Sequence, residues 1–273
     1  MLLCQREGRF WGSKPDRPTE TMMTLSYIRL DERLDAVQFA ELRAAKKMQR
    51  AFRHRFMLSW LFHELSLEGV VLDEGDLERA LAGKAGRDYC DDELLERIRR
   101  YREAVRRLSE ASSNRETLTR RTLLEYQAII DGMQPKSAAR TSSGATEAYK
   151  HDVLEPEEID GAVVDLLAEL KEREMRSHPI ELAIYAHYRL IQIWPFERHS
   201  AAVARLAANQ ILCSHGYPPA LIHAHDRQGY YHSLHYNISR LQGIVVSSIE
   251  SQIELRERLF ARRSASRSYA AAL

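Results

Sequence analysis

Apolar residues recur at helical spacing over most of the chain, with polar and charged residues between them. The stretch from Asp31 to His63 shows this pattern clearly, and such a period is typical of helices with one buried face. The same pattern predicts helices over 91–112, 116–131, 156–174, 178–193, from Ser200 to before Gly216, 228–240 and 245–262. We therefore expect an all-α fold.

Helix ends carry signals of their own. Pro156 is followed by two glutamates, which suits a first helical turn. Pro195 ends the helix before it, because a proline cannot continue the hydrogen-bond ladder. Ser200 is the expected N-cap of the next helix, and Gly216 ends that helix.

Three segments lack the helical period. Residues 134–155 are rich in Ser, Thr, Ala and Gly, and a loop of this length inside a compact domain is usually functional or mobile. A short hairpin fits around Ser143 and Gly144. We expect a flexible arm at residues 1–27 and a tail at residues 263–273.

The composition narrows the classes of function. The sequence has 40 basic and 39 acidic side chains and a net charge of +1, so charge gives no reason to expect nucleic-acid binding. Cys4, Cys90 and Cys213 are too few and too scattered for a disulfide framework. No stretch has the apolar length of a signal peptide or a membrane span. We expect a cytoplasmic protein with reduced thiols and no membrane partner.

The segment 178–234 carries a more specific pattern, HPIELAIYAHYRLIQIWPFERHSAAVARLAANQILCSHGYPPALIHAHDRQGYYHSL. It resembles the core of the Fic (Fido) family, where an apolar helix ends in His-Pro-Phe and an acidic position, Gly-Asn-Gly-Arg, two residues and Arg follow. Further on, that family has Gly-Tyr-Pro, an Arg and a Tyr-Tyr pair. The matching residues here are Pro195, Phe196, Arg205, Gly216, Tyr217, Pro218, Arg227, Tyr230 and Tyr231.

The resemblance extends upstream. The stretch FHELSLEGVVLDEGDLERAL is similar to the inhibitory helix of the family, written Ser/Thr-x-x-x-Glu-Gly/Asn. Glu68 and Gly69 fit that motif, whereas Glu64 replaces its Ser/Thr. TLLEYQAIIDGM resembles the helix before the target-binding flap, which makes residues 134–155 the flap.

This comparison implies a division of the chain into five parts. Between the arm and the tail lie an N-terminal helical region at 28–114, with an inhibitory-type helix near 57–69, a Fic core at 115–240, and a C-terminal helix at 241–262.

The family moves AMP from ATP to a protein hydroxyl, and the resemblance implies which groups that transfer needs. A His acts as base, an acidic residue holds Mg²⁺, Gly-Asn-Gly forms an anion nest and two arginines hold phosphates. At the matching positions this chain has Trp194, Arg198, His199-Ser200-Ala201, Ala202 and Arg205. Of these, only Arg205 is the residue that the family has. The Cβ atoms of His199, Ser200 and Ala201, which replace Gly-Asn-Gly, make a positive φ costly there.

We therefore expect a Fic-like protein that is inactive for AMP transfer and acts as a binding or regulatory module. ATP and Mg²⁺ follow from the resemblance alone, so no cofactor or metal is assigned. The candidate partners are a protein, a small phosphorylated ligand or a second copy of the chain. The alternative is an enzyme with altered transferase or phosphate-ligand chemistry in the same pocket. In that case His199 is the catalytic residue and Arg198, Ser200 and Arg205 bind the anion.

Several of these residues also have plainer interpretations. His199 can be an ordinary polar loop residue, and Trp194 with Phe196 can pack in the core rather than stack on a ligand ring. Glu68 and Arg205 can form the inhibitory-type ion pair or be unrelated charged residues.

A histidine-rich stretch near the end of the Fic-like region leaves a further choice open. His223, His225, His232 and His235 can hold a metal, since two of them share a helix face. The plainer interpretation is that they are solvated loop and surface side chains, because a metal site needs a third fixed ligand that the spacing does not supply.

Overall fold

A computed structural model describes residues 20–133, 140–142, 153–236 and 238–261, with side chains from Tyr27 onward except at residues 235, 236 and 261. Helices dominate this part of the chain, and no strand occurs within it, so the prediction of an all-α fold is confirmed. The hairpin expected around Ser143 and Gly144 and the tail at 263–273 lie outside the described residues. The expected arm at 1–27 is too long, because a helix already begins at Glu20.

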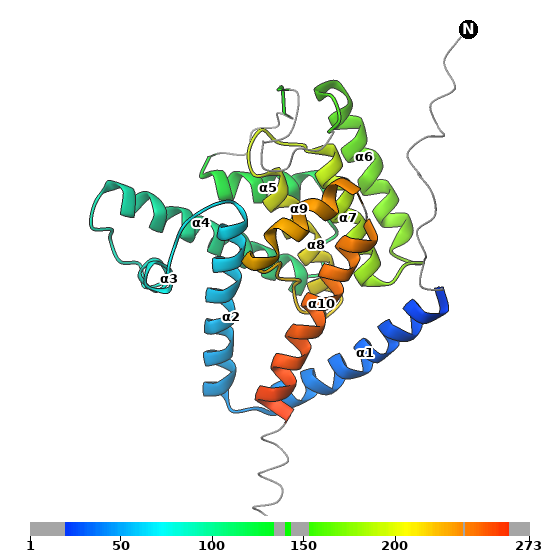
Figure 1. Cartoon of the computed structure of the whole chain (residues 1–273), viewed down its shortest axis with the longest axis horizontal. Helices are drawn as coiled ribbons and strands as arrows, with labels where there is room; N and C mark the ends of the chain where they lie inside the picture. Colours follow the sequence, from blue (N-terminus) through cyan, green and yellow to red (C-terminus); the bar gives the residue numbers. More distant parts are fainter. Residues whose placement is uncertain (1–19, 134–139, 143–152, 237, 262–273) are drawn as a thin grey trace, which may run out of the picture.

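Figure 1 shows how the helices follow one another along the chain. Their bounds are α1 Glu20–Arg43, α2 Lys46–Leu67, α3 Glu74–Leu81, α4 Tyr89–Ser113, α5 Arg120–Asp131, α6 Pro156–Arg173, α7 Pro179–Ile193, α8 Ser200–Ser214, α9 Arg227–Tyr236 and α10 Ile238–Arg256. A 3-10 turn, Ala224–Asp226, precedes α9, and a π turn, Glu257–Ala261, follows α10.

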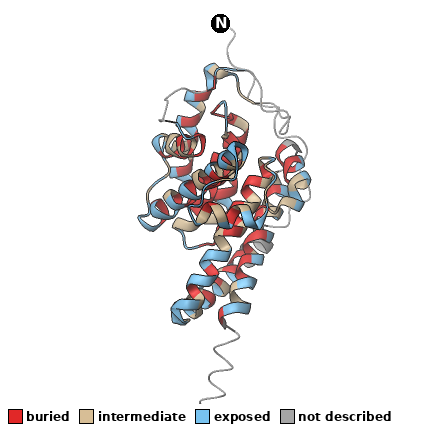
Figure 2. Cartoon of the chain, turned by 90° about the vertical axis from the view of Figure 1, so that its left-hand side faces the viewer, coloured by how far each residue is buried: buried red, intermediate tan, exposed pale blue. Residues whose placement is uncertain are grey.

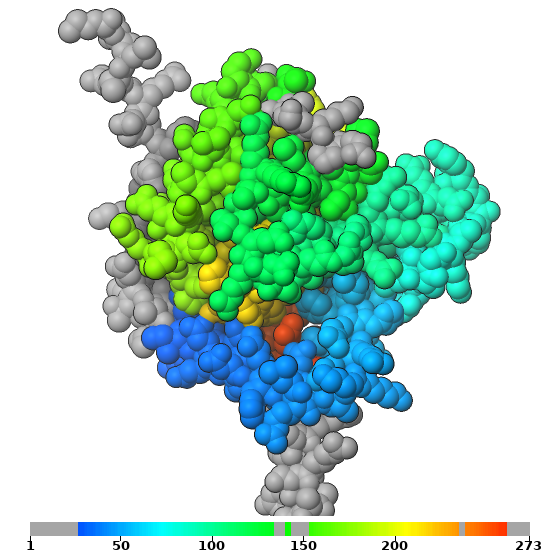
Figure 3. Space-filling view, turned by 180° about the vertical axis from the view of Figure 1, so that it is seen from behind, coloured from blue at the N-terminus to red at the C-terminus, as the bar shows by residue number. Residues whose placement is uncertain are grey.

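Helix α8 is the centre of the fold. Every residue from Ser200 to Leu212 is buried, and α7, α4 and α5 pack around it. In the view from behind, the gold atoms of this region show only as a small area between the green helices and the blue α1 (Figure 3). The many alanines of this helix suit this place, because small side chains let its neighbours approach closely. Its buried polar side chains, Arg205, Asn209 and Gln210, are hydrogen-bonded inside the protein.

The helical pattern of Asp31–His63 is interrupted in the structure. Helix α1 ends at Arg43 and α2 begins at Lys46. The buried amide of Gln49 donates hydrogen bonds from Nε2 to the carbonyl oxygens of Glu41, at 2.8 Å, and Ala44, at 3.0 Å. These bonds satisfy acceptors that the end of α1 leaves open, so the break is stabilised by the next helix.

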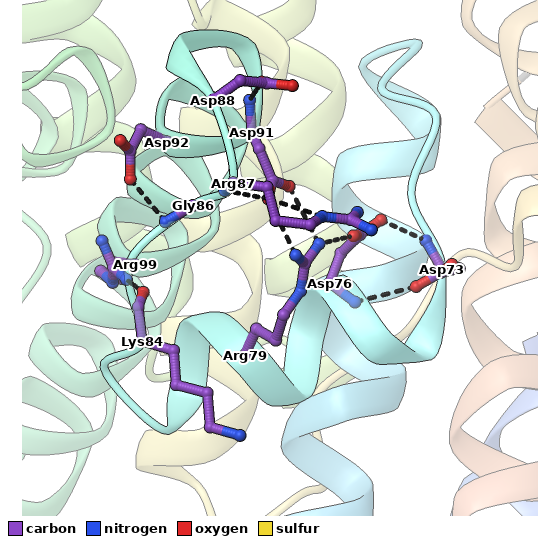
Figure 4. A network of polar contacts seen from close by, with 10 residues as sticks. All are labelled: Asp73, Asp76, Arg79, Lys84, Gly86, Arg87, Asp88, Asp91, Asp92 and Arg99. Carbon is purple, nitrogen blue, oxygen red and sulfur yellow. Dashed lines mark hydrogen bonds and ion pairs between the residues drawn. The ribbon is translucent and has the colours of Figure 1, made fainter.

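A polar network fastens α3 to α4 directly after the inhibitory-type segment (Figure 4). Asp73 and Asp76 form a capping box at the start of α3. Arg79 then donates to Asp76 at 2.6 Å and to Asp91 at 2.8 Å. The segment that follows Gly69 therefore leads into a helix, α3, that is fixed to α4 by hydrogen bonds and ion pairs.

The C-terminal helix, expected at 241–262, begins earlier and ends in the π turn. Arg33 of α1 pairs with Glu257 at 2.9 Å, and the Phe52 and Phe260 rings meet edge to face at 5.3 Å. These contacts hold the π turn after α10 against α1 and α2, in the lower part of Figure 1. Buried positions run through the middle of the body and exposed ones cover its outer faces (Figure 2).

Among the described helices, none combines the length and the apolar character needed to cross a lipid bilayer.

Candidate functional site

The loop between α7 and α8 is bounded by two residues in the left-handed conformation. Trp194 closes α7 with φ 49°, and His199 precedes α8 with φ 68°. Neither is a glycine, and the left-handed region costs an ordinary residue about 1–2 kcal/mol. The cost expected for a Cβ atom at positive φ therefore applies to His199, and the loop adopts this conformation despite it.

The aromatic residues of the loop are buried. Trp194 is 3% exposed and Phe196 is 6% exposed, and both belong to the hydrophobic core. This fits the core-packing interpretation of the two rings. The indole thus fills the position that the family resemblance assigns to the catalytic base, and an indole has no lone pair that can accept a proton.

Ser200 closes the loop rather than capping the helix. Its Oγ accepts a hydrogen bond from the Phe196 N–H and donates one to the Phe196 carbonyl, both at 2.8 Å. The N-cap of α8 is His199, without a side-chain cap bond, so the expected cap at Ser200 is wrong by one residue. Because Ser200 is 1% exposed, its hydroxyl and the Phe196 N–H are already engaged with each other.

Arg205 lies in the first half of α8 and is 4% exposed. Its Nη2 is 2.6 Å from Oε1 of Glu68, the residue that follows the last turn of α2. Its Nε donates to Oε1 of Glu64 at 2.7 Å, and the same Glu64 oxygen lies 2.6 Å from Nη2. The ion pair anticipated with Glu68 is therefore present, and Glu64 adds a second carboxylate to it.

Burial and charge act against each other in this cluster. Burial raises the pKa of the Glu64 carboxyl, and the charge of Glu68 acts in the same direction, although Arg205 opposes both. His187 bonds the hydroxyl of Tyr230 at 2.9 Å. Burial, aided by the positive charge of Arg205, lowers the pKa of His187 to about 3. The imidazole is therefore neutral at pH 7, and the cluster holds its charge in one guanidinium and two carboxyl groups.

Arg198 and His199 share a buried carboxylate at the end of α5. Oδ1 of Asp131 lies 3.2 Å from Nη1 of Arg198 and 3.4 Å from Nε2 of His199. The Asp131 side chain is 2% exposed, whereas the Arg198 side chain is 69% exposed. Burial lowers the pKa of His199, which favours a neutral imidazole near pH 7.

The loop is also joined to the flap. Arg140, which is 1% exposed, donates from Nε to the Trp194 carbonyl at 3.0 Å, and its backbone N–H donates to the Pro195 carbonyl at 2.9 Å. In return, Glu197 accepts the backbone N–H groups of Thr141 at 2.6 Å and Ser142 at 2.9 Å.

These hydrogen bonds act on the charge of Glu197 as well as on its position. Together with the hydroxyl of Ser142, they lower the pKa of Glu197 to about 2. The carboxylate is therefore ionised throughout the neutral range, where it accepts charge-assisted bonds from the flap.

Two of the four histidines noted in the sequence meet a third from α2. The rings of His63 and His223 lie 4.4 Å apart, and His223 and His225 lie 5.3 Å apart. His232 is exposed, and the side chain of His235 lies outside the described residues. Within the described part of the chain, no three His, Cys, Asp or Glu side chains are placed to hold a metal ion.

Sequence reasoning placed Glu68, Arg198, Ser200 and Arg205 near one another, and the structure gathers them around the start of α8. It missed the partners: Glu64 and Asp131 as carboxylates, and Arg140 and Glu197 as the link to the flap. Of these partners, only Glu64 could have been anticipated from the sequence. It lies four residues before Glu68, and residues four apart lie on the same face of a helix.

Comparison with known proteins relates this chain to Fic proteins. The sequence model of the Fic/DOC family matches residues 117–212. Protein adenylyltransferase fic-1 of Caenorhabditis briggsae is 26% identical over 206 residues, 72% of this chain and 40% of that protein. Protein adenylyltransferase Fic of Nematostella vectensis is 27% identical over 216 residues, 76% of this chain and 48% of that protein. The chain thus spans less than half the length of these relatives.

Solved structures show the same fold. A Fic-domain signalling protein of Bacteroides thetaiotaomicron superposes with a TM-score of 0.71 at 20% identity, covering 85% of this chain and 97% of that one. Residues 134–508 of Fic-1 from C. elegans superpose with a TM-score of 0.67 at 23% identity, covering 90% of this chain and 76% of that one. Residues 117–212 therefore form a Fic/DOC family domain within this chain.

Proposed function

We propose that this chain is a Fic-type protein that does not transfer AMP and acts as a binding or regulatory module. One observation carries the proposal: the buried indole of Trp194 stands where the family places its base. Without a proton acceptor there, a target hydroxyl has no group to activate it. The relatives named as adenylyltransferases are about a quarter identical, and the match covers less than half of their length, so their activity does not carry over directly.

The residues at the metal position do not fit a magnesium ion. Arg198 stands where the family has an acidic ligand, and a cation at that site repels Mg²⁺. The neighbouring Asp131 oxygen already faces Arg198 and His199. The carboxylate of Glu197 is occupied by the flap. We therefore assign no step to Mg²⁺ or ATP in this chain.

The remaining anion-binding groups are engaged inside the protein. Arg205 is held by Glu64 and Glu68, and Ser200 is bonded to the loop backbone. A module of this kind offers its outer surfaces to a partner rather than its pocket to a nucleotide. The partner classes that remain in the proposal are a protein or a small phosphorylated ligand.

The test is label transfer from α-labelled ATP, with Mg²⁺, to the protein itself and to lysate proteins. We expect no transfer from the wild type and none from Glu68→Gly, the change that should release an intact Fic protein. A Fic protein with the complete His-Pro-Phe loop serves as the positive control. Labelling by this chain that depends on Mg²⁺ and disappears in Arg205→Ala would refute the proposal.

A second candidate function rests on the contact between Asp131 and His199. A catalytic imidazole needs a group that orients it, and Asp131 lies 3.4 Å from Nε2 of His199. In this alternative, His199 acts as a base on a phosphorylated substrate and Asp131 positions it.

The second candidate requires a ligand, which a thermal-shift screen of nucleotides and phosphorylated metabolites can find. A shift of several degrees that vanishes in His199→Gln would favour it. Asp131→Asn is the matched control for position, since it should weaken the effect without removing the imidazole. The absence of any shift across the screen leaves the module as the better account.

A further inference from the structure

We propose that Glu64 is a second, independent hold on Arg205, which makes the inhibitory-type contact permanent in this chain rather than releasable. The inference rests on the proposed function, because it explains how the pocket stays closed to polyphosphate ligands. In the family motif, as the resemblance gives it, this position carries Ser or Thr, and a hydroxyl cannot neutralise a guanidinium.

Both carboxylates contact the same edge of the Arg205 guanidinium. Oε1 of Glu64 lies 2.7 Å from Nε and 2.6 Å from Nη2, and Oε1 of Glu68 lies 2.6 Å from the same Nη2. Nε and Nη2 form the edge that a carboxylate or phosphate usually binds with two parallel bonds. Both carboxylates therefore compete for the atoms that a phosphate ligand would need.

The two glutamates are held to different degrees. Glu64 lies inside α2, one turn before its end, with its side chain 7% exposed. Glu68 lies beyond the last turn, with its side chain 14% exposed. Glu68 belongs to the segment that connects α2 with α3, whereas the backbone of Glu64 is fixed near Arg205 by the last turn of α2.

The end of α2 is anchored from the other side. The hydroxyl of Tyr231 donates to the Leu67 carbonyl at 2.5 Å, and Nε of Arg227 donates to the Tyr231 hydroxyl at 2.9 Å. This chain of bonds runs from α9 to the last turn of α2, so Glu64 stays over Arg205 when Glu68 departs. Removal of Glu68 alone then leaves the guanidinium neutralised and its Nε still engaged.

The experiment uses inorganic triphosphate without Mg²⁺ as the probe and isothermal titration calorimetry as the readout. Glu68→Gly and Glu64→Ser are matched single variants, each of which leaves one carboxylate on Arg205. We expect each single variant to bind the probe within about twofold of the wild type. The double variant should bind at least about tenfold more tightly, the scale of one charge-assisted hydrogen bond.

Adding Arg205→Ala to the double variant should abolish the gain. Equal affinity of Glu68→Gly and of the double variant for triphosphate would overturn the proposal, because Glu64 would then contribute nothing to excluding the probe from Arg205. A folded double variant without any gain would overturn it as well.

A second measurement covers the case in which the double variant does not fold. In Glu68→Gly, the Nε–H of Arg205 should give a resolved NMR signal protected from solvent exchange, since Glu64 still accepts it. Exchange as fast as that of a surface arginine would contradict the proposal. Neither readout involves AMP transfer, so label transfer can fail or succeed without deciding the role of Glu64.

Discussion

Oε1 of Glu68 lies 2.6 Å from Nη2 of Arg205, which joins the end of α2 to the first half of the central helix α8. The contact is long-range in sequence. It ties α2 to α8, and Glu64 reinforces it from the preceding turn. The consequences of this arrangement can be measured as stability, activity and pH dependence.

The first prediction is a ranking of stability losses in the cluster. Arg205→Ala should cost most, on the order of 3–5 kcal/mol, because it leaves two buried carboxylates without a cation. Glu64→Ala should cost more than Glu68→Ala, since Glu64 contacts two nitrogens and is more buried. Chemical denaturation of each variant measures these losses.

The matching double-mutant cycle tests whether the contact contributes energy. The loss in Glu68→Ala with Arg205→Ala should be smaller than the sum of the two single losses. A coupling energy within about 0.5 kcal/mol of zero would mean that the ion pair contributes nothing measurable.

The second prediction concerns restoration of the base. Trp194→His returns an imidazole to the loop but leaves Arg198 at the metal position and Ala202 at the position of the first arginine. Groups that act as a unit in catalysis are strongly non-additive, so we expect no AMP transfer from α-labelled ATP. The outcome that contradicts this is clear transfer by the single variant above the wild-type background.

Trp194→His should also lower the free energy of unfolding, which can be measured separately from AMP transfer. Trp194 is 3% exposed in the core, and replacing a buried aromatic ring by a smaller one leaves a cavity. The expected loss is on the order of 2–4 kcal/mol. A Trp194→Phe variant, which keeps an apolar ring, should lose less and remain equally inactive.

The third prediction is acid destabilisation through His63. Burial lowers the pKa of His63 to about 4, helped by His223 and His225, with Asp226 acting in the opposite direction. A histidine with a lowered pKa in the folded state binds its proton more readily when unfolded. The stability is therefore intact above the ordinary pKa of about 6.5 and falls as the pH drops from there towards 4.

Denaturation midpoints between pH 7 and 4 measure this effect. The full shift corresponds to at most about 3 kcal/mol, and to less because the ring is only partly buried. His63→Gln should make the pH dependence shallower without removing it, because the lowered pKa values of His187 and His199 act in the same direction. The control His232→Gln, on the exposed face of α9, should keep the wild-type slope. Equal slopes in the wild type and in His63→Gln would contradict the assignment.

The fourth prediction compares two glycines. Gly132 ends α5 with φ 72°, and a Cβ atom there would lie 2.3 Å from Cζ of Arg100. The guanidinium of Arg100 bonds the Asp131 carbonyl at 3.2 Å, so a shift of its side chain disturbs the residue that faces His199. Gly132→Ala should cost about 1–2 kcal/mol.

Gly161 in α6 is the matched control, because a Cβ atom there meets nothing within 4 Å. Gly161→Ala should stabilise the protein by up to about 1 kcal/mol through better helix propensity. Thermal or chemical denaturation of both variants checks the pair. A neutral Gly132→Ala would show that the end of α5 tolerates a side chain.

The helical class, most helix positions and the resemblance to the Fic family could be predicted from the amino-acid sequence. Helical periodicity, Pro156 and Pro195 located α6 and the end of α7, because local spacing and backbone chemistry act over a few residues. The motif positions from Pro195 to Tyr231 located the Fic-like core. The break between α1 and α2 escaped notice, since it depends on where the buried side chain of Gln49 reaches.

Which charged side chains contact one another became visible in the folded chain. Asp131 reaches His199, and Glu197 and Arg140 join the loop to the flap, through contacts between distant segments. Glu64 looked like a departure from a motif and proved to be a carboxylate on Arg205. Periodicity says which face of a helix is buried, but not which buried charge lies opposite. That choice depends on how α2 and α8 cross, because a buried guanidinium is stabilised only by partners that the packing brings within hydrogen-bond distance.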